Sequence, residues 1–260
     1  MSPPLIEMQA ISKTFGAVVA LRRVDLRIKH GEVLGLVGDN AAGKSTLMKI
    51  LSGAYRPDSG EILLEGQRVQ LDGPIAARGA GIEMTYQDFA LVPQLTVMQN
   101  IFLGRERLRR HLGVVTLDRR AMDAAAEAMF AKLGLRVPSV STPVRELSGG
   151  QQQAVAIARA TGFDAKLVIM DEPTANLGTS AIDKVRETIS RMKASGVAVI
   201  IISHRLEDVF TVGDRVMVMK HGHVVGNRAV SDTATAEIVH MIVAGIDPRQ
   251  TVVPEEPELS

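Results

Sequence analysis

The stretch Gly38-Asp39-Asn40-Ala41-Ala42-Gly43-Lys44-Ser45-Thr46 determines how the rest of this 260-residue sequence is interpreted. It follows the mostly apolar run Glu32-Val33-Leu34-Gly35-Leu36-Val37, which is typical of a short strand, and it opens a segment of helical composition that reaches Leu51. In such a strand–turn–helix, backbone N–H groups of residues 41–46 can surround a phosphate at a helix N-terminus. The spacing G-x-x-x-x-G-K-S therefore predicts a phosphate-binding loop, and a chance glycine-rich turn is the alternative.

Polar residues also follow two other apolar runs. Asp171 and Glu172 come after Leu167-Val168-Ile169-Met170, and Ser203-His204 follows Val199-Ile200-Ile201-Ile202. Strands buried on both faces belong in a parallel sheet, whose carboxyl ends share one edge with the phosphate loop. We expect Asp171 to hold Mg²⁺ through water, Glu172 to polarise an attacking water, and His204 to contact the γ-phosphate or orient Glu172. A solvated acid pair and an ordinary loop histidine are the alternatives.

Composition excludes several classes of protein. Thirty basic and twenty-nine acidic residues leave a net charge of +1, which argues against a nucleic-acid partner. The absence of cysteine excludes disulfides, thiol catalysis and thiolate metal sites. With 46% hydrophobic and 23% charged residues the chain is globular in composition, and it lacks the long apolar run of a membrane helix. Any membrane role is therefore expected to act through a partner.

The pattern of elements predicts an α/β fold with a helical insertion. Alternating apolar residues over the first thirty positions predict antiparallel strands, and strands are also expected at 61–65 and 82–87. Helical composition marks 96–103, 118–133 and 149–161, with an exposed, charged segment at 105–115 between the first two. Strands return at 167–170, 197–202 and 214–219. We expect a parallel-sheet core, an N-terminal antiparallel β subdomain, and a helical subdomain inserted at roughly 93–162.

Leu147-Ser148-Gly149-Gly150-Gln151-Gln152-Gln153 predicts a second anion site. A hydroxyl and two glycines stand before an alanine-rich helix, so bare backbone N–H groups would face a ligand. A helix cap alone would account for Ser148, but not for the paired glycines and three glutamines. One chain can hardly bring this site and the phosphate loop to one γ-phosphate, whereas two chains arranged head to tail can. The sequence thus predicts a dimer with nucleotide held between the two copies.

These motifs, in this order, resemble those of the ATP-binding subunits of ABC transporters. Gly38–Thr46 is similar to Walker A, Leu147–Gln151 to the signature motif, and Leu167–Glu172 to Walker B. Gln87 resembles the Q-loop glutamine and His204 the switch histidine. Phe15, in Lys13-Thr14-Phe15-Gly16, takes the place of the aromatic that stacks on adenine. The resemblance covers about residues 5–245, and it implies an ATP-binding domain at 1–247 followed by a flexible tail at 248–260.

The resemblance implies ATP and Mg²⁺ as cofactors and assigns a role to each matching residue. The implied catalytic residues are Glu172, His204 and Gln87. The implied Mg²⁺ ligands are Ser45, Gln87 and Asp171. The implied nucleotide-binding residues are Phe15, Gly38, Asp39, Asn40, Ala41, Ala42, Gly43, Lys44, Ser45, Thr46, Ser148, Gly149, Gly150 and Gln151.

Three further segments resemble the class that imports ribose, xylose and fructose: Tyr86–Val97, Asn100–Glu106 and Thr233–Gly245. The resemblance implies an ATP-hydrolysing subunit that drives a membrane permease for a monosaccharide through ATP-dependent dimerisation. The implied partners are a second copy, integral membrane permease subunits and, indirectly, a periplasmic sugar-binding protein. The implied location is peripheral, at the cytoplasmic face of the inner membrane. An ABC ATPase for another substrate, or one acting on ribosomes or DNA, is the alternative.

The sequence departs from the family's pattern at three points. Ala41 stands where many relatives have glycine, so either no positive φ is needed there or nucleotide affinity is reduced. Gly178 replaces the usual D-loop aspartate, which puts signalling between the two ATP sites in doubt. Importers of this class commonly fuse two ATP-binding halves, and this chain has one, which puts the exact subclass in doubt.

Overall fold

A six-stranded sheet forms the centre of the molecule. The computed structural model describes residues 3–86, 88–111, 114–175 and 177–249. The strand order is β12-β11-β3-β10-β9-β6, and every pair except β11–β12 is parallel. The strands are β3 (Val33–Val37), β6 (Ile82–Thr85), β9 (Leu167–Asp171), β10 (Ala198–Ile202), β11 (Arg215–Lys220) and β12 (His223–Ala229). The predicted parallel-sheet core is confirmed.

The central strands are apolar throughout because both of their faces are covered. Every residue of β3 and β10 is buried. Leu34 and Ile200 belong to a core cluster with helix α1 (Lys44–Leu51), whereas Val33 and Val199 belong to the core cluster on the other side. This double burial explains why these runs do not show the alternation of a half-exposed strand.

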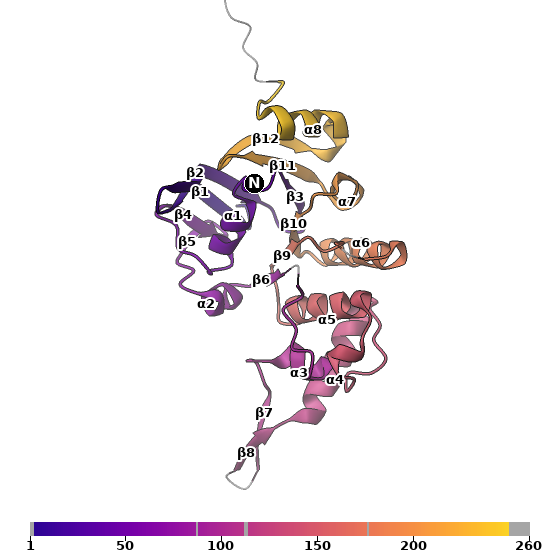
Figure 1. Cartoon of the computed structure of the whole chain (residues 1–260). Coiled ribbons are helices and arrows are strands. Elements are labelled where there is room, and N and C mark those ends of the chain that lie inside the picture. The colour runs from indigo at the N-terminus through magenta and orange to yellow at the C-terminus, as the bar shows by residue number, and fades with distance from the viewer. Residues whose placement is uncertain (1–2, 87, 112–113, 176, 250–260) are drawn as a thin grey trace, which may run out of the picture.

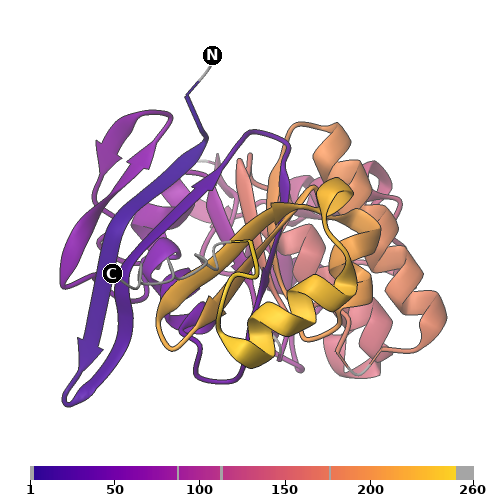
Figure 2. The ribbon, with the colours of Figure 1, turned by 90° about the horizontal axis from the view of Figure 1, so that it is seen from above.

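A four-stranded antiparallel sheet packs on the α1 side of the central sheet, as Figures 1 and 2 show. Its order is β2-β1-β4-β5, and its strands are β1 (Ile6–Phe15), β2 (Val18–Ile28), β4 (Ser59–Leu64) and β5 (Gln67–Val69). Helix α1 lies between the two sheets, and α2 (Pro74–Gly79) lies below it in Figure 1. The predicted N-terminal β subdomain is confirmed.

Helices cover the opposite face and one end of the central sheet. Between β6 and β9 the chain forms α3 (Val97–Phe102), α4 (Arg119–Leu133), a 3₁₀ turn (Val144–Glu146) and α5 (Gly149–Thr161), which confirms the three predicted helices. The later helices are α6 (Thr179–Ala194), α7 (Leu206–Val212) and α8 (Thr235–Ala244), with a 3₁₀ turn at Val230–Asp232. Within the described residues, no helix has the length and apolarity needed to cross a bilayer.

The described residues of the charged segment at 105–115 are mostly exposed, as expected. From Leu108 to Leu117 the chain forms a β-hairpin of β7 (Leu108–His111) and β8 (Val114–Leu117), which within the described part of the chain pair only with each other. The sequence did not predict these strands because neither has a buried face, so no apolar–polar alternation marks them. The end of the predicted tail, residues 250–260, lies outside the described residues.

Candidate functional site

The register of the sheet brings three polar strand ends to one edge. Ile202 at the end of β10 pairs with Leu36 of β3 on one side and with Asp171 of β9 on the other. The chain leaving each strand therefore carries Gly38, Glu172 or His204 to the same place. A cavity of about 330 Å³ beside this edge is lined by residues that include Gly38, Asp39 and His204.

Two glycines shape the loop between β3 and α1. Gly38 has φ 146°, and a Cβ there would lie 2.1 Å from the Met219 carbonyl oxygen. Gly43 has φ 101°, and a Cβ there would lie 2.7 Å from the Ala20 carbonyl oxygen. Only glycine fits both the backbone conformation and the space.

Ala41, in the same loop, has φ 65°. The sequence left two expectations for this position, and the first, that no positive φ is needed there, is wrong. The loop folds through a left-handed residue although alanine supplies it.

Lys44, at the start of α1, points back into the loop. The lysine is only 6% exposed, and its Nζ donates to the carbonyl oxygens of Gly38 (2.6 Å) and Asp39 (2.9 Å). Burial lowers the pKa of Lys44, while the carboxylates of Glu172, Asp39 and Asp171 act against that shift. An ammonium group held by uncharged carbonyls in a partly desolvated loop is suited to bind a phosphate oxygen.

The carboxylates at the end of β9 face the same place. Glu172 Oε1 lies 3.2 Å from His204 Nε2, and the His204 backbone N–H donates to Glu172 Oε2 at 3.4 Å. Burial raises the pKa of both Asp171 and Glu172, opposed chiefly by Lys44 at Asp171 and by His204 at Glu172. Glu172 also has φ 48°, and such backbone strain is concentrated at functional sites.

The donor set at this edge fits Mg²⁺. The described residues contain no cluster of three or more acidic, histidine or cysteine side chains that could hold a metal alone. Mg²⁺ is usually held by one or two protein oxygens together with water and substrate phosphates, so such a cluster is not required. Asp171 and the exposed Ser45 hydroxyl are the oxygen donors that the loop and β9 supply.

Ser148 and Gln151 form a capping box at the N-terminus of α5. The Gln151 N–H donates to Ser148 Oγ at 3.4 Å, and the Ser148 N–H donates to Gln151 Oε1 at 2.9 Å. Both residues and Gly150 line a cavity of about 440 Å³ that α5 shares with α6 and that contains no residue of the phosphate loop. The cap accounts for Ser148 and Gln151 structurally and leaves the Gly149 and Gly150 N–H groups at the helix end.

Phe15 lies at the end of β1 and is 43% exposed. Its ring makes an edge-on contact with Tyr55 at a centroid distance of 5.3 Å, and Lys13 Nζ lies 5.5 Å from its centroid. Lys13 is in turn ion-paired with Asp58 at 2.6 Å. These contacts hold an aromatic ring that is open to solvent.

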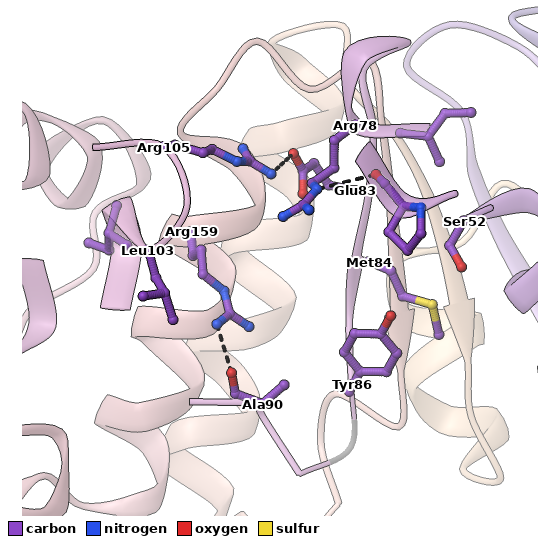
Figure 3. Close-up of a pocket in the computed structure, with 12 residues that line it drawn as sticks. Ser52, Arg78, Glu83, Met84, Tyr86, Ala90, Leu103, Arg105 and Arg159 are labelled. Atoms are coloured by element: carbon purple, nitrogen blue, oxygen red, sulfur yellow. Dashed lines mark hydrogen bonds and ion pairs between the residues drawn. The ribbon is translucent and has the colours of Figure 1, made fainter. Parts of the chain in front are cut away.

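Gln87 lies outside the described residues, but the chain on its C-terminal side is firmly held. Phe89 and Ala90 both have positive φ, 60° and 45°, and their carbonyl oxygens accept from Arg159 of α5 at 2.9 and 2.7 Å. Figure 3 shows Arg159 reaching Ala90 across a cavity of about 260 Å³ that Arg105, bonded to Glu83, also lines. One side chain thus ties the segment after Gln87 to the helix that Ser148 caps.

Sequence reasoning missed Arg159 and a buried network around Asp208. Asp208 of α7 is 2% exposed; it accepts from Thr174 Oγ1 at 2.5 Å and from Arg186 Nη2 at 2.6 Å. The network joins α6 and α7 to the segment that follows Glu172. The sequence did contain a signal for Arg159, because this charged residue stands in the otherwise apolar stretch of α5.

Comparisons with known proteins agree with this geometry. Residues 21–175 match the family described as ABC transporter. A ribose import ATP-binding protein of Rubrobacter xylanophilus is 48% identical over 92% of this chain and 47% of its own length. A xylose/arabinose import ATP-binding protein of Sulfolobus acidocaldarius is 41% identical over 92% of this chain and 94% of its own length. The chain thus spans about half the length of the ribose-import relative.

Solved structures show the same fold. An ATP-binding cassette of an ABC transporter in its ADP conformation aligns with a TM-score of 0.78 at 25% identity, covering 95% of this chain and 96% of that one. A dimeric cassette bound to ADP and phosphate aligns with a TM-score of 0.73 at 25% identity, covering 86% and 98%.

The parallel core with its phosphate loop, the antiparallel subdomain and the helical insertion with a capped Ser-Gly-Gly define an ATP-binding cassette. The chain belongs to the ABC transporter family. Within it, the chain is similar to the ATP-binding proteins of sugar importers.

Proposed function

We propose that this chain is the ATP-hydrolysing, energy-coupling subunit of an ABC importer for a monosaccharide similar to ribose, xylose or fructose. The observation that carries the proposal is the meeting of Lys44, Asp171, Glu172 and His204 at one edge of the sheet. The names of the similar proteins support the substrate class.

In the proposed reaction Lys44 Nζ exchanges its two loop carbonyls for outer phosphate oxygens of ATP. Glu172 accepts a proton from the water whose oxygen attacks the γ-phosphorus, while the bond from that phosphorus to the bridging oxygen breaks and ADP leaves with the electron pair. The raised pKa of Glu172 makes it a stronger base than an exposed glutamate. His204, already 3.2 Å from Glu172, holds that carboxylate in position. Bound Mg²⁺, held by Ser45 and through water by Asp171, would neutralise charge on the phosphates.

The second half of each site would come from another copy. Ser148 and Gly150 line a cavity that contains no residue of the phosphate loop, so one chain would supply two half-sites. Phe15 would stack on adenine, and Gln87 would be a catalytic residue and a ligand of Mg²⁺. Dimer closure on ATP and opening after hydrolysis would then move the permease, as expected of a population shift that γ-phosphate contacts drive.

Nucleotide-driven closure can be tested with Glu172→Gln in saturating Mg-ATP. This variant should sediment as a dimer, because binding survives while water activation fails. Glu172→Gln combined with Lys44→Ala should remain monomeric because the phosphate-binding cation is gone. A monomer in both cases would contradict the proposed closure.

The transport assignment needs a different experiment. The tagged chain should be recovered from its native membranes in mild detergent with a polytopic permease and a sugar-binding protein, identified by mass spectrometry. Recovery with ribosomes or DNA instead would contradict the importer and leave the ATPase assignment untouched.

A further inference from the structure

The hairpin β7–β8 projects from the helical region at the end of the molecule farthest from α8 (Figure 1). In the part of the chain that the structure describes, its strands pair only with each other. A two-stranded hairpin standing alone is marginally stable in water, so one that exposes apolar side chains indicates a surface with a binding partner.

The register divides the hairpin into two faces. Leu108 pairs with Leu117, and Arg110 pairs with Val115, so these four side chains share a face. Its three apolar residues are exposed: Leu108 by 66%, Leu117 by 44% and Val115 by 52%. This face therefore combines a short aliphatic strip with one arginine.

The segment that carries this strip is rich in arginine. Five exposed arginines lie between residues 106 and 120: Arg107, Arg109, Arg110, Arg119 and Arg120. The two carboxylates of the same segment accept from backbone N–H groups, Glu106 from Gly104 and Asp118 from Ala121. Among the described residues none of the five arginines is in an ion pair, whereas the chain as a whole carries only +1.

We propose that the β7–β8 hairpin binds the anionic headgroup surface of a lipid bilayer, with its aliphatic strip at the headgroup–acyl boundary and its arginines on lipid phosphates. Aliphatic side chains mixed with arginines have the composition of interfacial membrane binders. The proposal rests on the proposed function only in placing this chain beside a membrane.

The observations favour a lipid surface over a macromolecular partner. The described residues of β7 and β8 include no phenylalanine, tyrosine or tryptophan, whereas protein interfaces depend on such aromatic anchors and single-stranded nucleic acid on aromatic stacking. The four side chains on this face are also far fewer than the roughly 20–30 residues that each partner contributes to a stable protein interface. A lipid headgroup surface, which attracts positive charge and admits a few aliphatic side chains, requires neither aromatic anchors nor a large contact.

The experiment is co-sedimentation of the purified chain with vesicles, without any permease. The chain should bind vesicles made of equal amounts of phosphatidylcholine and phosphatidylglycerol, bind pure phosphatidylcholine far less, and dissociate with added salt. Arg109→Gln with Arg110→Gln should weaken binding by more than tenfold, since each basic residue at such a surface contributes roughly fivefold. Val115→Ser should weaken binding with its charge unchanged.

The matched control is Arg56→Gln with Arg68→Gln, which removes the same charge from exposed side chains of the antiparallel subdomain. It should bind like the wild type. Equal loss in the control, or no dependence on phosphatidylglycerol, would overturn the proposal. So would a hairpin variant that binds vesicles normally but fails to retain the permease in detergent, because the partner would then be a protein. ATP-driven dimerisation of Glu172→Gln should be the same with or without the hairpin changes, which separates this proposal from the proposed function.

Discussion

Ala41 places a left-handed residue with a Cβ in the middle of the phosphate loop. This conformation costs an alanine about 1–2 kcal/mol relative to glycine. Because the positive φ belongs to the folded loop, the cost falls on the free energy of folding rather than on ATP binding. The loop keeps its shape because Gly38 and Gly43, which the surrounding carbonyls tightly restrict, anchor its two ends.

Ala41→Gly should therefore stabilise the protein by about 0.5–1 kcal/mol after the entropy that glycine adds to the unfolded chain. Urea unfolding measures this change. Calorimetric titration with ATP should show nearly unchanged affinity. Tighter binding at unchanged stability would show instead that the strain develops only when nucleotide binds.

Glu172 predicts a second effect at the residue scale, in the pH dependence of stability. Burial raises its pKa, so the folded chain binds this proton more tightly than the unfolded chain does. At a pH below the pKa that Glu172 has in the unfolded chain, its carboxyl is protonated in both the folded and the unfolded state and does not change stability. As pH rises through the folded pKa, ionisation progressively destabilises the fold.

Glu172→Gln removes that ionisation, so the variant should be more stable than the wild type near neutral pH. The two free energies of unfolding should converge as pH falls below the raised pKa. Thermal unfolding across an acid-to-neutral series, without nucleotide, measures the difference. A gap that widens toward acid would mean that the pKa shift has the opposite sign.

At the scale of elements, Arg159 holds the segment after Gln87 against α5 through two carbonyls that lie about seventy residues away in sequence. Arg159→Gln should destabilise the protein by about 2 kcal/mol, since a hydrogen bond from a charged group contributes about 1.5–3 kcal/mol. Arg159→Lys should recover only part of that lost stability, because lysine keeps the positive charge but lacks the planar guanidinium that donates to both carbonyls. Urea unfolding is the measurement, and Arg191→Gln, at an exposed i,i+4 pair, is the control that should change stability little.

Helix α6 begins without a cap. Gly178 is its N-cap in an extended conformation and has no side chain to bond the first turn, which contains no acidic residue. A Cβ at Gly178 would meet nothing within 4 Å. Gly178→Asp should thus stabilise the protein by about 0.5 kcal/mol, or roughly 1–2 °C in Tm. Gly178→Ala, which has no oxygen to cap with, should not, and equal stabilisation by both would exclude a capping effect.

The sequence predicted the elements that short, local patterns of residues determine. The phosphate loop follows from glycine spacing between an apolar strand and a helix, and the central strands from runs too apolar to be half exposed. Contacts between distant segments were not predictable, because Asp208 meets Thr174 and Arg186 only through the packing of α6 and α7. The β7–β8 hairpin escaped prediction for the opposite reason, since the described side chains of its strands are exposed and no apolar–polar alternation marks it.

At the scale of the whole molecule, the residues of the proposed ATP site lie in two separate places on the chain. Lys44, Glu172 and His204 gather at the sheet edge, whereas Ser148 caps a helix of the insertion and lines a cavity with α6. The central sheet and α5 pack in one continuous core, so the two places cannot approach each other without breaking that core. On our proposal, a complete site therefore needs two chains.

That division predicts complementation between two inactive variants. Lys44→Ala disables the loop half of each site, and Ser148→Arg should block the other half by placing a bulky cation beside the bare N–H groups of α5. Each homodimer should lack ATPase activity. In a mixed dimer both defects fall on one of the two sites, while the other combines an intact Lys44 with an intact Ser148. Mixing should therefore restore activity to at most one site per dimer, measured as phosphate release against the ratio of the variants. If mixtures stay inactive although cross-linking shows that mixed dimers form, one intact site is not sufficient, and hydrolysis requires both sites to act together.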